Sequence, residues 1–439
     1  MVNRRGLVGC INWKGTTRNE LSSAVSRPRQ RSGRSRFRKC SPLIVAALLL
    51  LVALVARGRG GTSRPPTSGA WETTSRADLA RTVETTSARL DEDAADATAA
   101  VALAEALLRL ARVDNDPAHA VRAERALRRA LDANPHDYLV RRELGAVLLS
   151  QHRFREAITE ATALRRERPD DVWNDGVLGD AHLELGDYDA AFDAFDRMVA
   201  VRPNAAAYAR VSYARELQGD REGAIRLMAM SLEATSAKDP EAQAWHEVQL
   251  GQLTFDGGDV PEARRHFDRA QFLFPDYGPA IEGQVRVLIS ERRLDQALAL
   301  AVRQLASRPT GTLAMLAGDV ARELGRHEDE ARHYAEAERL LQYEPAALAL
   351  FLADRDRDVT RAVEIAKAAA SIRQDILTED ALAWSLFKAG QHTEALTTIQ
   401  RALRTGSRDS RLLAHAAAIH VAVGDQGRRA ANPRKIADK

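Results

Sequence analysis

The sequence predicts an all-helical solenoid of repeated helix–turn–helix units, and three observations support this fold class. The first is a period, because Pro135, Pro169 and Pro203 stand 34 residues apart and Pro275 and Pro309 repeat the spacing. The second is that small and apolar residues recur in phase between these prolines. The third is composition, since 45% of the chain is apolar but only 5% is aromatic. A period of this length indicates stacked supersecondary units, and an alanine-rich, aromatic-poor chain favours close helix packing.

Each repeat places a Leu-Gly pair in a first predicted helix and an alanine in a second. The recurring positions are Leu144-Gly145, Leu178-Gly179 and Leu250-Gly251, followed by Ala157, Ala191, Ala263 and Ala297. Phe195 and Phe267 stand four residues after two of these alanines. This pattern resembles the tetratricopeptide repeat, a helix–turn–helix of 34 residues. The resemblance implies units at 104–135, 138–169, 172–203, 205–240, 244–275, 278–309, 311–342, 343–374 and 376–407, then a partial unit from Ser410.

The residue types in the third unit have a structural explanation. Gly179 and Ala191 have little or no side chain, so the two helices can approach closely. Phe195 and Leu178 fill the seam between them, and Pro203 ends the second helix because proline has no N–H to donate. One helix pair cannot bury its apolar face alone, so neighbouring units must stack. We therefore interpret these residues as core.

The rest of the chain is divided by composition. We expect a disordered basic leader (1–40), a signal anchor or signal peptide (41–57), a linker (58–76), an N-terminal helical cap (77–103), the solenoid (104–424) and a disordered basic tail (425–439). Two departures stand out within the solenoid. The fourth unit has extra residues at 234–240, and the partial tenth unit lacks an apolar second helix. The solenoid end is then either frayed or covered by a partner.

The leader is followed by an uninterrupted apolar run from Leu43 to Ala56, bounded by Lys39 and Arg57. Fourteen residues are short for a span of about 20 and resemble the core of a signal peptide. Retention as an anchor is favoured because Leu54 stands where a cleavage site needs a small residue, and flanking arginines can lengthen the span. Cleavage and secretion remain the main alternative, and a buried helix of a soluble protein is the third.

Charge predicts the topology of the chain and its class of partner. Residues 21–40 hold seven Lys or Arg and residues 57–76 hold four, so the N-terminus should stay in the cytoplasm and the repeats should be exported. Residues 1–76 hold 15 basic and two acidic residues, which leaves 49 basic and 59 acidic residues in 77–439. This acidic balance disfavours nucleic acid as a partner.

No motif in the sequence indicates catalysis, and we expect a protein that is not an enzyme and binds no cofactor or metal. The two cysteines, Cys10 and Cys40, lie in the leader, and no phosphate loop, nucleophile elbow or zinc motif occurs. The acidic run at 354–358 begins like a calcium loop, but Val359 stands where glycine is required. We interpret this run as a turn in which Asp358 caps the next helix.

The resemblance also implies a binding surface, since the first helices of tetratricopeptide arrays line a concave groove. The positions carried over are Trp173, Asp180, Glu184, Tyr213, Glu216, Trp245, Gln252, Phe255, Asp256, Asp380, Trp384, Phe387 and Lys388. Aromatic rings at such positions either bind a partner or pack against the preceding unit. The acids along the same face favour a peptide with basic and apolar side chains.

These observations lead to two hypotheses of function. The first is a membrane-tethered scaffold that binds proteins or peptides in its groove outside the cytoplasmic membrane. The alternative is an accessory or regulatory subunit of a separately encoded envelope enzyme. The partner and the oligomeric state stay open at this point.

Overall fold

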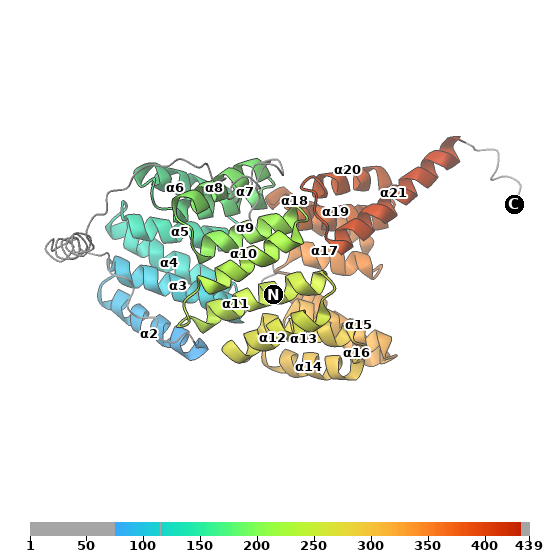
Figure 1. Ribbon diagram of the computed structural model, residues 1–439, viewed down its shortest axis with the longest axis horizontal. Coiled ribbons are helices and arrows are strands. Elements are labelled where there is room, and N and C mark those ends of the chain that lie inside the picture. Colours follow the sequence, from blue (N-terminus) through green and yellow to red (C-terminus); the bar gives the residue numbers. More distant parts are fainter. Residues whose placement is uncertain (1–74, 115, 432–439) are drawn as a thin grey trace, which may run out of the picture. The chain divides into compact units, whose positions relative to one another are not determined.

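The computed structural model describes residues 75–114 and 116–431, and every regular element within these ranges is an α-helix (Figure 1). The described part holds 20 helices and no strand, which confirms the predicted all-helical solenoid. Helix α2 (Arg76–Glu92) precedes the repeats. It begins at a capping box, in which the side chains of Ser75 and Asp78 each accept a hydrogen bond from the other residue's backbone N–H.

Nine helix pairs follow α2, and the helices of each pair pack against each other. The first helices are α3 (Ala97–Asp114), α5 (Tyr138–Ser150), α7 (Trp173–Glu184), α9 (Ala205–Leu217), α11 (Pro240–Asp256), α13 (Gly278–Ser290), α15 (Gly311–Glu323), α17 (Pro345–Asp354) and α19 (Ile376–Lys388). The second helices are α4 (Ala118–Ala133), α6 (Phe154–Glu167), α8 (Tyr188–Val201), α10 (Arg221–Glu233), α12 (Val260–Leu273), α14 (Leu294–Ser307), α16 (His327–Leu341), α18 (Val359–Ile372) and α20 (His392–Ala402). The single helix α21 (Ser410–Ala431) follows them.

The Gly-Asp pairs of the repeats form the turn inside a unit. Gly186 and Gly258 have φ angles of +75° and +86°, a left-handed conformation that glycine adopts without steric cost. The aspartates that follow, Asp187 and Asp259, accept a hydrogen bond from a backbone N–H in the first turn of α8 and α12. The turn and the start of the second helix are therefore both specified by two adjacent residues.

The seam between helices depends on aromatic rings that occupy the space left by glycines. Phe267 of α12 is 1% exposed. A Cβ atom on Gly251 of the same unit would lie 2.7 Å from its ring, and one on Gly283 of the next unit would lie 2.3 Å from it. Phe195 stands in the same relation to Gly179, at 2.3 Å. Each ring therefore requires glycine opposite it, and the ring of Phe267 joins two successive units.

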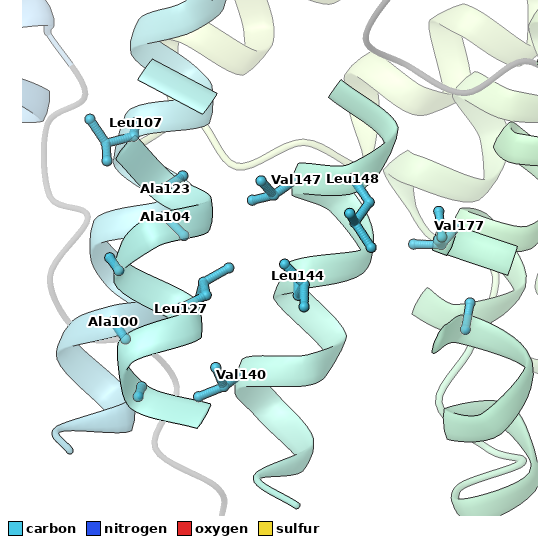
Figure 2. Close-up of a cluster of buried hydrophobic side chains, with 14 of the residues drawn as sticks. Ala100, Ala104, Leu107, Ala123, Leu127, Val140, Leu144, Val147, Leu148 and Val177 are labelled. Carbon is cyan, nitrogen blue, oxygen red and sulfur yellow. The ribbon is translucent and has the colours of Figure 1, made fainter. Parts of the chain in front are cut away.

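The first and second helices share one core across unit boundaries, as expected for a solenoid. Figure 2 shows Ala104 and Leu107 of α3, Leu127 of α4, Leu144 of α5 and Val177 of α7 within one cluster of buried side chains. Small residues alternate with leucine and valine in this cluster, so neighbouring helices approach closely. No unit in this part of the chain has a core of its own.

Two boundaries differ from the sequence-based expectation. Helix α3 begins at Ala97, so the predicted cap at 77–103 consists of α2 and the first turns of α3. Helix α21 continues to Ala431, so residues 425–431 of the predicted disordered tail are helical. The sequence has no proline between the start of α21 and Pro433, so no proline interrupts the helix before Ala431.

The predicted turn at 354–358 is present between α17 and α18. The carboxylate of Asp358 accepts a hydrogen bond from the backbone N–H of Arg361 at 3.1 Å, which confirms its predicted role as the cap of α18. Residues 354–358 therefore form a turn that ends in the cap of α18.

The predicted leader at 1–40, the apolar segment at 41–57 and nearly all of the linker at 58–76 lie outside the described residues. Within the ranges that the structure covers, no helix is long and apolar enough to cross a membrane.

We predict that Phe267→Ala lowers the free energy of unfolding by about 3–5 kcal/mol, because it leaves a cavity between two glycines that cannot fill it. Phe272→Ala is the matched control on the same helix, since the side chain of Phe272 is 73% exposed, and it should change stability by less than about 1 kcal/mol. Urea unfolding followed by circular dichroism measures both. Equal effects at the two positions would contradict the assigned seam.

Candidate functional site

A cavity of about 430 Å³ lies on the surface formed by the first helices of the C-terminal units. Helices α9, α11, α13, α15 and α17 all contribute lining side chains. The C-terminal end of α3 and residues 407–411, before and at the start of α21, also line the cavity, together with single residues of other helices. The lining includes the apolar side chains of Trp245 and Leu350 and the polar side chains of Glu282 and Gln304, and we call these two polar residues the polar side of the cavity. A concave, mostly formed space with a few polar groups is the usual geometry of a binding site.

One end of the cavity is held by ion pairs between α3 and α11, which are distant in sequence. The guanidinium of Arg109 lies 2.5 Å from a carboxylate oxygen of Asp239. Arg112 lines the cavity and lies 2.8 Å from Glu241, whose carboxylate is completely buried. Both pairs have two hydrogen bonds each, so their geometry is strongly directional. We call these two pairs the first brace.

A second set of contacts joins the third and fourth units to the eighth and ninth, and we call it the second brace. Arg373 lies 2.6 Å from the carboxylate of Glu184. The hydroxyl of Thr405 donates a hydrogen bond to the carbonyl oxygen of Leu217 at 3.0 Å. Side chains of α8, α9, α19, α20 and α21 belong to one buried apolar cluster, so hydrophobic contact accompanies these polar contacts.

The insertion in the fourth unit supplies the acids of the first brace. Asp239 belongs to the extra residues at 234–240, and Glu241 follows them in the first turn of α11. The departure from the 34-residue period therefore has a role in the structure: it carries Asp239, one of the two acids that hold α3 against α11, and directly precedes the other, Glu241.

Part of the chain matches a known repeat family. A family model described as "Tetratricopeptide repeat" matches residues 122–172 and 177–240. Tetratricopeptide repeats are therefore present within residues 122–240. No curated protein matches the sequence. The matched family indicates a repeat scaffold of the kind typical of protein–protein interaction, and no catalytic family is indicated.

Solved structures are similar to this chain at low identity. The human IFIT1 dimer with m7Gppp-AAAA has a TM-score of 0.50 and 14% identity, over 76% of this chain and 77% of that one. The Cut9–Hcn1 hetero-tetramer of APC/C gives 0.47 and 12%, over 79% of this chain but only 60% of that chain's length. Yeast Tom70 gives 0.42 and 13%, over 83% and 89%. At these identities the likeness shows the fold alone.

Four of the predicted groove residues line the cavity: Glu216, Trp245, Gln252 and Asp256. Trp245 is half-buried, and its ring meets the neighbouring His246 ring edge-on with centroids 4.9 Å apart. The amide of Gln252 donates a hydrogen bond to the carboxylate of Asp256 at 3.0 Å. The structure thus brings the predicted residues of α9 and α11 together around one space.

Three predicted acids are instead buried in contacts within the protein. Asp180 is 4% exposed and accepts two hydrogen bonds from Arg210, at 2.9 and 2.7 Å. Glu184 is part of the second brace, and Asp380 lies 2.8 Å from the Nδ1 atom of His415. Their repeat positions predicted that these acids are exposed. They are buried instead, because arginines and a histidine of neighbouring helices cover them.

The predicted residues of the ninth unit form a stacked group outside the cavity lining. The ring of Trp384 stacks on Phe387 and on His415, with centroids 4.8 and 4.0 Å apart. Its indole N–H donates a hydrogen bond to Asp354 at 2.7 Å, and Lys388 pairs with Asp356 at 2.6 Å. These side chains link α17, α19 and α21.

The three remaining aromatic positions also pack within the protein. The indole N–H of Trp173 donates a hydrogen bond to the carbonyl oxygen of Arg142 at 3.3 Å, and the Arg142 guanidinium lies over the ring. Tyr213 and Phe255 are partly buried against apolar clusters. For Trp173 the structure therefore agrees with the packing alternative.

The sequence reasoning missed the polar side of the cavity. Glu282 is 5% exposed and lies 34 residues after Val248, which also lines the cavity. The 34-residue period, extended from Val248, would therefore have indicated that Glu282 lies on the same surface. Gln304 belongs to the second helix α14, and no first-helix rule could have indicated it. Among the described residues, no group of three or more His, Cys, Asp or Glu side chains could hold a metal ion.

A pair of carboxyl groups lies elsewhere, with a half-buried Glu105 on α3 and a buried Glu143 on α5. Glu143 is 2% exposed, and its Oε2 atom has no hydrogen-bond partner among the described residues. Burial raises the pKa of Glu143 to about 8; the nearby Glu105 also raises it, while Arg142 opposes the shift. Burial raises the pKa of Glu105 as well. The folded protein therefore keeps a proton at neutral pH that the unfolded chain releases.

We predict that stability falls as the pH rises from about 5 to about 8, because the folded state holds more protons than the unfolded state in this window. The slope from this group cannot exceed about 1.4 kcal/mol per pH unit for one proton. Glu143→Gln, which cannot ionise, should flatten the slope and be more stable than the wild type at high pH. Glu222→Gln is the control, since that side chain is 91% exposed. Parallel stability curves for the wild type and Glu143→Gln, from urea unfolding at each pH, would rule the effect out.

Proposed function

We propose that this chain is a non-enzymatic scaffold that binds a segment of a partner protein in the cavity. The observation that carries the proposal is the cavity itself, which is lined by the first helices of five successive units and by the half-buried side chain of Trp245 in α11. Trp245 offers a large rigid apolar surface there, the kind of side chain that often dominates binding energy. The family match supports a scaffold, since such repeats typically mediate protein–protein interaction.

A peptide suits the cavity better than nucleic acid does. Residues 77–439 carry 59 acidic and 49 basic residues. Two of the arginines that line the cavity, Arg112 and Arg411, are paired with Glu241 and Asp380. The lining holds seven Asp or Glu side chains and six Arg side chains, so a phosphate backbone would meet no excess of positive charge on this surface.

The proposal includes a location: residues 41–57 hold the chain in the cytoplasmic membrane, and the repeats lie outside it. Support comes from the apolar run of Leu43–Ala56 and from the excess of arginine before it. Secretion after cleavage of the same segment is the alternative.

We predict that a photo-crosslinking amino acid placed at position 245 captures the partner in living cells, because this side chain lines the cavity. The same amino acid at position 272 is the control, since Phe272 lies on the second helix α12 and is 73% exposed. Mass spectrometry of the cross-linked products identifies what is bound. Capture at 272 but not at 245 would move the binding surface away from the cavity.

The same experiment separates the two hypotheses of function. A mixed set of envelope proteins at position 245 supports the scaffold. One enzyme captured in a fixed ratio supports an accessory subunit that regulates or positions that enzyme.

We predict that protease added to intact spheroplasts digests the repeats and spares a tag fused at Met1, because the basic residues before Leu43 keep the N-terminus inside. Immunoblotting for the tag and for the repeats gives the result. Digestion of the repeats only after lysis would reverse the topology, and a mature N-terminus near residue 57 would show cleavage.

A further inference from the structure

The polar side of the cavity is built around Glu282 of α13. Its carboxylate accepts a hydrogen bond from the hydroxyl of Thr310 at 2.7 Å. Glu282 is 5% exposed, so little water reaches it, and burial raises its pKa. No other hydrogen bond to this carboxylate is found within the described part of the chain. A buried carboxylate with so few donors can still accept a hydrogen bond from a ligand.

The charges around Glu282 are mixed. Glu344 lines the same cavity and lies close enough to raise the pKa of Glu282, whereas Arg286, one turn further along α13, favours its ionised form. Burial outweighs the arginine. A cation brought by a ligand would therefore be stabilised beside the carboxylate of Glu282 in this partly enclosed space.

A second, independent observation is an unused donor in the same cavity. Gln304 of α14 is 7% exposed and lines the cavity, and its Nε2 atom has no hydrogen-bond partner among the described residues. A buried amide group left without an acceptor costs free energy. An acceptor on a ligand, such as a carbonyl oxygen, would satisfy it.

Apolar side chains line the same cavity. Leu313, Leu350 and Phe351 line the cavity together with Trp245. They offer a surface to the methylene groups of a lysine stem or to an apolar neighbour in a peptide.

We propose that this part of the cavity is a subsite for an alkylammonium group and an adjacent carbonyl oxygen of a peptide. The ammonium donates hydrogen bonds to the carboxylate of Glu282, and the Nε2 atom of Gln304 donates to the carbonyl oxygen. The subsite rests on the proposed function and specifies its ligand chemistry. An ammonium of this kind belongs either to a lysine side chain or to a free peptide N-terminus, and the two sources share the same donors.

Four tripeptide amides test the subsite on the full-length protein. Leu-Lys-Leu-amide carries both ammonium groups, and its N-acetylated form carries only that of lysine. Leu-norleucine-Leu-amide carries only the terminal one, and its N-acetylated form carries neither. Saturation-transfer NMR titrations give the dissociation constant of each. We expect the peptide without an ammonium to bind at least about tenfold more weakly than the best of the others, and the two intermediate peptides show which source is used.

Variants assign the effect to the named residues. Glu282→Gln keeps an acceptor for Thr310, and it should weaken the best ammonium peptide by about tenfold while leaving the uncharged peptide unchanged. Gln304→Leu removes the donor and should weaken the charged and uncharged peptides by the same factor. Glu222→Gln, on the exposed surface of α10, is the control. Thermal unfolding of each variant confirms that it folds.

Two results would overturn the subsite. One is binding that is equal for all four peptides and insensitive to Glu282→Gln; the other is no detectable binding of any ammonium peptide. In either case cross-linking from position 245 could still succeed, so the failure of the subsite is distinguishable from the failure of the proposed function.

Discussion

The contact between an aromatic ring and a facing glycine is the constraint on which the rest of this structure depends. Phe267 lies between Gly251 and Gly283, and Tyr334 packs against Gly318, where a Cβ atom would lie 2.4 Å from the ring. Because each contact fixes how closely two helices approach, it also fixes how one unit stacks on the next. These second-helix rings hold the neighbouring first helices in place, and neither Phe267 nor Tyr334 lines the cavity itself.

Buried charges then determine which distant units meet. Glu241 and Glu184 lie on α11 and α7, and each is paired with an arginine far away in sequence. A buried ion pair contributes little net stability, but loss of one partner leaves a costly unpaired charge. We infer that these ion pairs mainly disfavour other arrangements of the units and add little to the free energy of unfolding. The result is a first-helix surface that is partly closed by the protein's own side chains, and the cavity is the part left open to a ligand.

Local features of the fold were predictable from the sequence, and long-range ones were not. The positions of Phe267 and Asp358 follow from spacing and from capping chemistry, which act over a few residues. The pairing of Glu184 with Arg373 has no local signal, because it depends on how several units stack. For the same reason Trp173 and Trp245 look alike in the sequence, yet only Trp245 lines the cavity. Repeat position predicts the face of a helix, whereas the neighbours of that face depend on the whole solenoid.

The cavity depends on contact between the fourth and ninth units, and disulfide cross-linking tests this contact most directly. Thr405 donates a hydrogen bond to the carbonyl oxygen of Leu217, the residue before Gln218. A variant with Thr405→Cys and Gln218→Cys, in which Cys10 and Cys40 are replaced by serine, is oxidised in the folded state and in urea. The structure predicts rapid intramolecular cross-linking in the folded protein only, seen as a mobility shift without reductant. Cross-linking that is no faster in the folded protein than in urea would contradict the contact between the fourth and ninth units.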